Sequence, residues 1–506
     1  MLHPLTSATE IELKFQVPAP QVAGLRRALA AGAVQRTRLQ AVYVDTADGR
    51  LAAAGIALRL RKEGRRWVQT LKGRGDGLMQ RLEHEVALPP QRGIPQLDVE
   101  RHAGTEAAAL LAAALGDPPA ELEPLYRTDI RRTHRVVRSG GAHVEVALDE
   151  GAIHGGERRL AVCEIEFELL RGPPQALLAL AARWLRRHRL WLDVRTKAER
   201  GHRLALGLDR VAAVKAGATS IQRHQAPADA LAAMLRSALA QALPNAAEIG
   251  AGTSVPEHVH QLRVGLRRAR CALRVFGAWA RDPAAAEALE LRLREPFTRL
   301  GAARDLDALS ATLLPALQAA GAPEMQLGHG PTPESPTVVL QDPAFGELLL
   351  ELLGLTQPAP AVPAGWDLPG MGRAPLADMR EPARKALARL HRKVLSDAQG
   401  FIGAAEADQH RTRKRLKRLR YACEFVAPLF PARPQRALLV ALREALDALG
   451  EYNDLLVAHE LFRAAVERDP RAWFAIGWLQ ARREVLLKRC ERSLAKLAAA
   501  KVFWRD

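Results

Sequence analysis

The 506-residue chain has few aromatic residues, only 5 % of its positions, and four cysteines that lie far apart. Scarce aromatic rings argue against a single-stranded nucleic-acid site, because such sites stack bases on aromatic side chains. The cysteines form no CxxC pair, which argues against a zinc cluster or a disulfide framework and fits a reducing compartment. No uncharged apolar run approaches the roughly 18 residues of a membrane span. We therefore expect a soluble cytoplasmic protein, without a leader segment and without a membrane partner.

Positive charge is in excess. Lys plus Arg total 74 against 56 for Asp plus Glu, which gives a formal net charge of +18. Such a surplus predicts an anionic partner, such as a phosphate polymer, nucleic acid or a membrane surface. The alternative is that arginine simply occupies solvated faces, so the distribution of charge along the chain has to decide. A chain of this length predicts two domains.

The N-terminal part of the chain has the period of β-strands with one charged face. In the sequence EIELKF, a strand would place Glu10, Glu12 and Lys14 on one side and apolar residues on the other. The same alternation recurs at 58–61, 81–86, 144–149 and 164–169, with helical patterns at 19–31, 105–115 and 174–189. Any single strand of this kind could turn its charges to water. Several such strands predict a closed sheet whose lumen binds a metal and a polyanion, because both signs of charge are then satisfied.

These residues resemble the CYTH domains, the triphosphate tunnel metalloenzymes, whose hallmark is the ExExK strand seen at Glu10, Glu12 and Lys14. The resemblance implies an eight-stranded antiparallel tunnel that binds a triphosphate end-on with Mg²⁺ or Mn²⁺. Position by position, it implies metal ligands, phosphate-binding cations and acidic residues that assist the metal or orient water. The implied metal ligands are Glu10, Glu12, Glu164 and Glu166; the phosphate-binding residues are Lys14, Arg59, Arg61, Lys72, Arg127 and Lys197; the catalytic acids are Asp149 and Glu83. Arg81 and Arg200 join the substrate-binding set or serve as ion-pair partners.

After residue 208 the composition changes. Residues 209–226 are short of large apolar side chains and read as a linker between a tunnel domain at 1–208 and a helical domain at 227–506. An internal repeat lies in the helical part, since His260 and Arg263 recur as His410 and Arg413, 150 residues later. The sequence therefore predicts an α+β protein whose C-terminal helical bundle has two pseudo-symmetric halves.

Each copy of the repeat builds a basic stripe along a helix. This part resembles the CHAD domain, the conserved-histidine α-helical domain, whose members are associated with inorganic polyphosphate. The resemblance implies polyphosphate contacts from His260, Arg263, Arg267, Arg268, His410, Arg413, Lys414, Lys417 and Arg418. The open alternatives are that the charge run is a solvated face and that the two histidines are core residues.

Together these patterns predict a metal-dependent inorganic triphosphatase that hydrolyses tripolyphosphate to pyrophosphate and phosphate, with a helical domain that binds polyphosphate. A polyphosphate-binding protein without turnover is the alternative, as are thiamine triphosphatase and adenylate cyclase activities. The presence of all four implied metal-binding glutamates favours catalysis, because a protein that only binds polyanions would bind them better without these negative charges. We expect no nucleic-acid partner and an association with polyphosphate granules, and the sequence indicates no oligomeric state.

Overall fold

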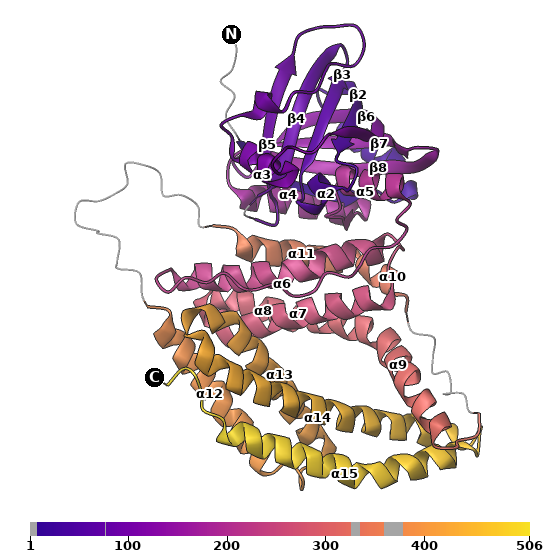
Figure 1. Cartoon of the computed structure of the whole chain (residues 1–506), viewed down its shortest axis with the longest axis vertical. Coiled ribbons are helices and arrows are strands. Elements are labelled where there is room, and N and C mark those ends of the chain that lie inside the picture. Colours follow the sequence, from indigo (N-terminus) through magenta and orange to yellow (C-terminus); the bar gives the residue numbers. More distant parts are fainter. Residues whose placement is uncertain (1–7, 76, 325–333, 359–377, 506) are drawn as a thin grey trace, which may run out of the picture. The chain divides into compact units, whose positions relative to one another are not determined.

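The computed structural model describes residues 8–75, 77–324, 334–358 and 378–505 (Figure 1). The chain divides into two compact units, which are described separately. The first, here called the tunnel unit, comprises Met1–Val214, Ala242–Leu262 and Thr337–Pro360. The second, the helical unit, comprises Lys215–Gln241, Arg263–Pro336 and Ala361–Asp506.

The tunnel unit is built on one antiparallel sheet in the order β5-β4-β3-β2-β6-β7-β8-β1-β9. Strand β1 pairs with β8 and also with β5, so the sheet closes on itself and the expected eight-stranded tunnel is confirmed. The short ninth strand adds to β1. The strands are β1 (Ala8–Gln16), β2 (Gln35–Asp45), β3 (Ala57–Glu63), β4 (Arg66–Arg74), β5 (Gln80–Leu88), β6 (Glu123–Ser139), β7 (Ala142–Gly155), β8 (Arg158–Arg171) and β9 (Trp191–Leu192).

The two faces of the closed sheet follow from the period-two sequence. On β1, Leu13 and Phe15 are buried on the outer face, while Glu10, Glu12 and Lys14 line the interior cavity. Burying the apolar outer face requires a cover, and helices provide most of it. These helices are α1 (Val22–Leu29), α2 (Arg50–Ala53), α3 (Glu106–Leu115), α4 (Pro174–His188) and α5 (Lys197–Leu206).

Two of these helices fix the shape of the tunnel. On the outer face, Trp184 of α4 packs edge-on against Phe167 of β8, with ring centroids 5.9 Å apart. Helix α5 begins at a capping box formed by Thr196 and Glu199, which satisfies backbone groups at its first turn. Its apolar residues then pack against a cluster that contains Tyr43 and Tyr126, so α5 contributes to the wall of the cavity.

Two segments from later in the chain belong to the tunnel unit. Helix α11 (Pro343–Thr356) packs on α4 at Gly346, where a side-chain carbon would lie 2.8 Å from Leu185. Gly250, at the end of α6 (Pro227–Gly250), approaches Trp191 as closely. The expected linker at 209–226 contains no helix. The compact units interleave along the chain, so they do not correspond to single continuous segments. The domain boundaries drawn from the sequence, at 1–208 and 227–506, therefore stay a prediction.

The helical unit repeats one motif. Helix α7 (Pro256–Phe276) continues into the 3₁₀ turn Gly277–Trp279, and α13 (Glu406–Val426) continues into the 3₁₀ turn Ala427–Leu429, 150 residues later at every boundary. Long helices follow both turns, which agrees with the expected pseudo-symmetric halves. The remaining helices are α8 (Pro283–Arg292), α9 (Arg294–Ala319), α10 (Pro336–Leu340), α12 (Arg380–Gln399), α14 (Ala432–Ala465) and α15 (Ala472–Ala499).

Candidate active site in the tunnel

The interior of the closed sheet is a cavity of about 1180 Å³ whose lining includes residues of all eight barrel strands and of α5. Charged side chains of both signs face it, as the alternation predicts. The structure places most of the predicted site residues on this lining: Glu10, Glu12, Lys14, Arg59, Arg61, Lys72, Arg81, Glu83, Asp149, Glu166 and Lys197. Glu164 and Arg200 are buried and form an ion pair with each other. Both lie next to the cavity, because Glu164 also pairs with Lys197, which lines it.

Three carboxylates form the Glu164 group, defined as Asp149, Glu164 and Glu166. One oxygen of each lies within 4.8 Å of the others. Lys197 from α5 reaches all three, with its Nζ atom 2.7 Å from Asp149, 2.5 Å from Glu164 and 2.8 Å from Glu166. Arg132 adds a bidentate contact, in which Nε and Nη2 donate to the two oxygens of Asp149 at 2.7 Å. The acidic group is therefore already surrounded by cations.

These cations keep the Glu164 group ionised. Burial alone would raise the pKa of Glu164, but Lys197, Lys14 and Arg200 outweigh it and lower that pKa to about 2. The pKa of Glu166 is likewise held well below its usual range, against the effect of burial, by Lys197 and Arg132. Lys14 is buried, and burial lowers its pKa despite the nearby carboxylate of Glu164.

A second set of acids, the Glu10 group, consists of Glu10, Glu83, Glu145 and Glu168. Lys72 bridges two of them, with Nζ 2.8 Å from Glu10 and 2.9 Å from Glu83. Burial and the neighbouring Glu10 raise the pKa of Glu168 to about 8, against the opposing effect of Lys72. Burial also raises the pKa of Glu10. In the Glu10 group, burial and the neighbouring acids therefore outweigh the attraction of Lys72.

The strand register separates the two groups. Gln16 lies opposite Glu164 on the neighbouring strand, whereas Glu12 lies opposite Glu168. Glu10 is six residues before Gln16, a separation of roughly 20 Å along a strand. Glu12 itself is held by Arg81 at 2.8 Å. The structure therefore does not bring Glu10 and Glu12 into the cluster formed by Glu164 and Glu166.

The arginines of β3 are held by residues of β2 and β5. Arg59 donates to the hydroxyl of Tyr43 at 3.0 Å, and Arg61 lies 2.8 Å from Glu85. Tyr43 in turn stacks on Tyr126, with ring centroids 4.6 Å apart. Burial would raise the pKa of Tyr43, but the adjacent Arg59 lowers it. The sequence alone gives no sign of the contact between Tyr43 and Arg59.

Two arginines of strand β6 differ from the prediction. Arg127 was expected in the tunnel but lies outside it, and Arg132 lines the tunnel although it was not predicted. Arg127, expected among the phosphate-binding cations, is exposed and lines a different pocket, outside the tunnel. Arg132 lies five residues later and therefore on the opposite face, where it lines the tunnel. The signal for Arg132 was weak, because the other members of its face include Tyr126 and Ile130, which look like core residues.

In the helical unit, basic side chains of α7 and α13 approach one another. Burial lowers the pKa of Lys417 to about 7, and the charges of Arg267 and Arg413 contribute. The ring of Phe297, on α9, lies 5.3 to 5.4 Å from the guanidinium groups of three α7 arginines: Arg263, Arg267 and Arg270. Lys414 is exposed, whereas Arg418 is half-buried and burial lowers its pKa.

Three further predicted residues of this region differ in their surroundings. Arg268 is buried, donates to Ser237 and Gln241, and lies over the ring of Phe425, so it faces the interior of the bundle. His410 is exposed, and its Nδ1 lies 3.0 Å from Asn453 Oδ1. His260 is half-buried on α7.

The two units match two family models. Residues 8–204 match the CYTH domain and residues 233–463 match the CHAD domain. The chain is a CYTH domain followed by a CHAD domain. Among curated proteins it is similar to an inorganic triphosphatase of Haemophilus influenzae, with 31 % identity over 202 residues that cover 38 % of this chain and 54 % of that protein. The match thus spans about half the length of this relative.

Solved structures are similar to each domain. The CHAD domain of Ricinus communis is 29 % identical, with a TM-score of 0.44, over 57 % of this chain and 99 % of that one. A putative adenylyl cyclase from Hippeastrum, described as having a dominant triphosphatase activity, is 21 % identical, with a TM-score of 0.28, over 39 % of this chain and 96 % of that one. Within the described residues, none of the helices has the length and apolar character needed to cross a membrane.

The CYTH tunnel has two acidic groups that suit a hard divalent cation, because their ligand atoms are carboxylate oxygens. The distances between oxygens favour the Glu164 group as the metal site, whereas the charges around the carboxylates favour the Glu10 group. The oxygens of the Glu164 group are the closest together, but Lys197 and Arg132 already balance them. In the Glu10 group, burial and the charge of Glu10 raise the pKa of Glu168, so a bound cation would gain more there than among carboxylates that already have cationic neighbours.

Proposed function

We propose that the CYTH tunnel hydrolyses inorganic tripolyphosphate to pyrophosphate and phosphate in the presence of Mg²⁺ or Mn²⁺. The observation that carries this proposal is the convergence of buried cations and carboxylates from opposite strands inside one closed sheet. A chain of phosphoryl groups would neutralise Arg59, Lys72 and Arg132, while a divalent cation would neutralise carboxylates of the Glu10 group.

The cationic residues would bind and orient the substrate. Arg132 and Arg59 present planar guanidinium groups, which bind phosphate oxygens with two parallel hydrogen bonds. Lys197 and Lys72 add point charges beside them. Each of these side chains is now held by carboxylates, with Lys197 on Asp149 and Lys72 on Glu83. The acids therefore place the cations and keep them charged before substrate enters, so that little reorganisation is needed.

The Glu10 group would hold the divalent cation, and the Glu164 group would chiefly position Lys197 and Arg132. A bound Mg²⁺ or Mn²⁺ would supply charge neutralisation for the phosphoryl oxygens. Glu83 contacts Lys72 at 2.9 Å and lines the cavity, and its carboxylate would accept a proton from an attacking water. Asp149 is engaged by both nitrogens of Arg132, which favours a positioning role for this acid.

The CHAD domain would bind inorganic polyphosphate along its basic face, which we define as Arg263, Arg267, Arg413, Lys414 and Lys417. The surroundings of Lys417 support this proposal, because burial, together with the charges of Arg267 and Arg413, lowers its pKa to about 7. A linear polyanion would neutralise these cations. Arg268 is not included, since it faces the interior of the bundle.

Phosphate release from tripolyphosphate, longer polyphosphate, ATP and thiamine triphosphate, with and without Mg²⁺, tests the assignment. We expect Mg²⁺-dependent release that is fastest with tripolyphosphate and lost in Lys72→Met. Arg66→Met is the matched control, because Arg66 is an exposed residue at the start of the same strand, β4. Faster turnover of ATP or thiamine triphosphate than of tripolyphosphate would show that the preferred substrate is an organic triphosphate. Tight binding without release from any of them would make the protein a polyphosphate-binding protein.

A further inference from the structure

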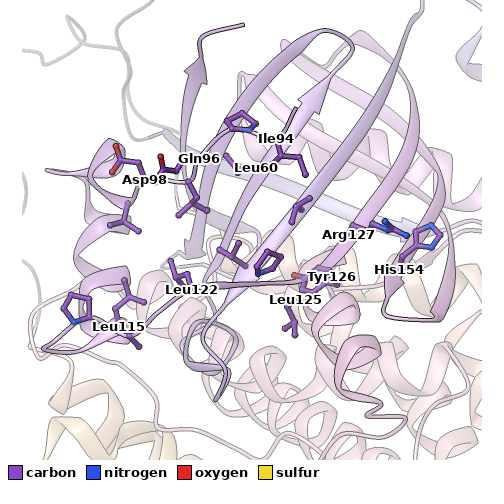
Figure 2. A pocket seen from close by; sticks show the side chains of 18 of the residues that line it. Leu60, Ile94, Gln96, Asp98, Leu115, Leu122, Leu125, Tyr126, Arg127 and His154 are labelled. Carbon is purple, nitrogen blue, oxygen red and sulfur yellow. The ribbon is translucent and has the colours of Figure 1, made fainter. Parts of the chain in front are cut away.

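A second pocket lies on the CYTH barrel, lined by residues of β2, β3 and β6 and by Leu115 of α3 (Figure 2). It has a volume of about 980 Å³, which is within the range of small-molecule sites. Its floor includes the outward apolar residues Val42 and Leu60. Ile94, on the loop after β5, forms part of its wall and is 62 % exposed. The pocket is therefore an open, apolar groove. It shares Val44 and Tyr126 with the lining of the tunnel, but none of its charged residues lines that cavity.

Charge is distributed unevenly along this groove. Figure 2 shows Arg127 and His154 close together at one end, and Gln96 and Asp98 toward the other. The carboxylate of Asp98 is already used, because it accepts from the backbone N–H of Glu100. The side chain of Arg127 has no hydrogen bond, ion pair or ring contact with any residue in the described part of the chain. The one end of the groove thus offers a cation with free hydrogen-bond donors.

We propose that this groove binds a small amphiphile with an anionic head, such as a fatty acid or an alkyl phosphate. The apolar body would cover Val42, Leu60 and Ile94, which gains free energy in proportion to the apolar area removed from water. The carboxylate or phosphate would lie on Arg127, whose guanidinium group binds both with two hydrogen bonds. The proposal does not depend on the activity of the tunnel, because none of the groove's charged residues faces the cavity of the Glu164 group.

Isothermal titration of the full chain tests the site with three probes below their micelle concentrations: dodecanoate, dodecyl phosphate and dodecyltrimethylammonium. We expect one molecule of either anionic probe per chain, bound about fivefold more tightly than the cationic probe. Arg127→Gln should remove that preference. Arg131→Gln should retain it, because Arg131 is exposed on the same face of β6 but does not line the groove.

Ile94→Glu should weaken dodecanoate binding at least about fivefold, since it places a carboxylate on the apolar wall, whereas Ile402→Glu, at an exposed position in the helical unit, should not. Three results would overturn the proposal. These are equal binding of anionic and cationic probes, displacement of dodecanoate by tripolyphosphate, which would place it in the tunnel, and binding only to phosphatidate vesicles, which would make the groove a membrane contact. Loss of a dimer in Ile94→Glu without loss of a dodecanoate site would likewise assign the groove to a second copy of the chain.

Discussion

Replacing Glu168 by Gln should stabilise the metal-free protein. Burial and the charge of Glu10 raise the pKa of Glu168 to about 8 in the folded state, against 4.5 for an ordinary glutamate. Between these two values the folded protein holds a proton that the unfolded chain has released. Raising the pH through this window therefore lowers the stability of the wild-type protein, and the neutral amide of Gln removes the effect.

The magnitude follows from the two pKa values. At pH 7 the difference between about 8 and 4.5 corresponds to about 3 kcal/mol of destabilisation relative to a neutral side chain, and at pH 5 to about 1 kcal/mol. These are upper limits, because solvent screens part of the interaction. For a domain of 150 to 250 residues, about 3 kcal/mol corresponds to a rise in Tm of roughly 6 to 12 °C.

Thermal unfolding followed by circular dichroism, in the presence of a chelator at pH 5, 7 and 8, provides the assay. The matched control is Glu157→Gln, at an exposed position in the turn between β7 and β8. Adding Mg²⁺ at pH 7 should stabilise the wild-type protein and the control but have little effect on Glu168→Gln. The reasoning is refuted if Glu168→Gln lowers the Tm of the metal-free protein at pH 7, or if it cannot be distinguished from Glu157→Gln.

Three further predictions follow from the same charges. Lys197→Met should destabilise the metal-free protein by about 3 to 5 kcal/mol in urea denaturation, because it removes a cation that contacts all three buried carboxylates of the Glu164 group, whereas the exposed Lys215→Met should have no effect; equal stability would contradict the Lys197 network. Arg132→Lys should lower kcat/KM for tripolyphosphate about tenfold or more, since lysine cannot make the bidentate contact; an unchanged kcat/KM would remove Arg132 from the site. Polyphosphate affinity should fall as the pH rises from 6 to 8, because the Lys417 ammonium, with its pKa of about 7, loses its proton, and Lys417→Arg should flatten this dependence. An identical pH profile in Lys417→Arg would show that another group, such as His410, titrates instead.

The tunnel was predictable because the alternation of charged and apolar residues is a local property of the sequence. Charged residues such as Glu10 and Glu166 alternate with apolar ones, so their shared face could be assigned before their partners were known. Which residues lie opposite one another on neighbouring strands could not be predicted from the sequence. Only the register shows that Glu164 lies opposite Gln16, and therefore that the first and last strands contribute to two acidic groups rather than one.

Residues at changes of face and element were harder to predict. Arg127 and Arg132 differ by an odd number of positions, so placing one of them inside the tunnel puts the other outside. Helix α5 was not predicted, although Thr196 and Glu199 form a capping box, which is a sequence signal for the start of a helix. In the helical unit, Arg268 belongs to the same basic run as Arg267 but faces Gln241, because neighbouring residues on a helix point about 100° apart.

The central claim is that the closed, charged lumen hydrolyses a triphosphate chain. A ³¹P NMR time course of inorganic tripolyphosphate with the full chain and Mg²⁺ tests it most directly. We predict equal amounts of pyrophosphate and orthophosphate appearing as the tripolyphosphate signals decline, and no change with Lys72→Met. Tripolyphosphate that stays intact in the presence of folded, Mg²⁺-loaded wild-type protein would contradict the account.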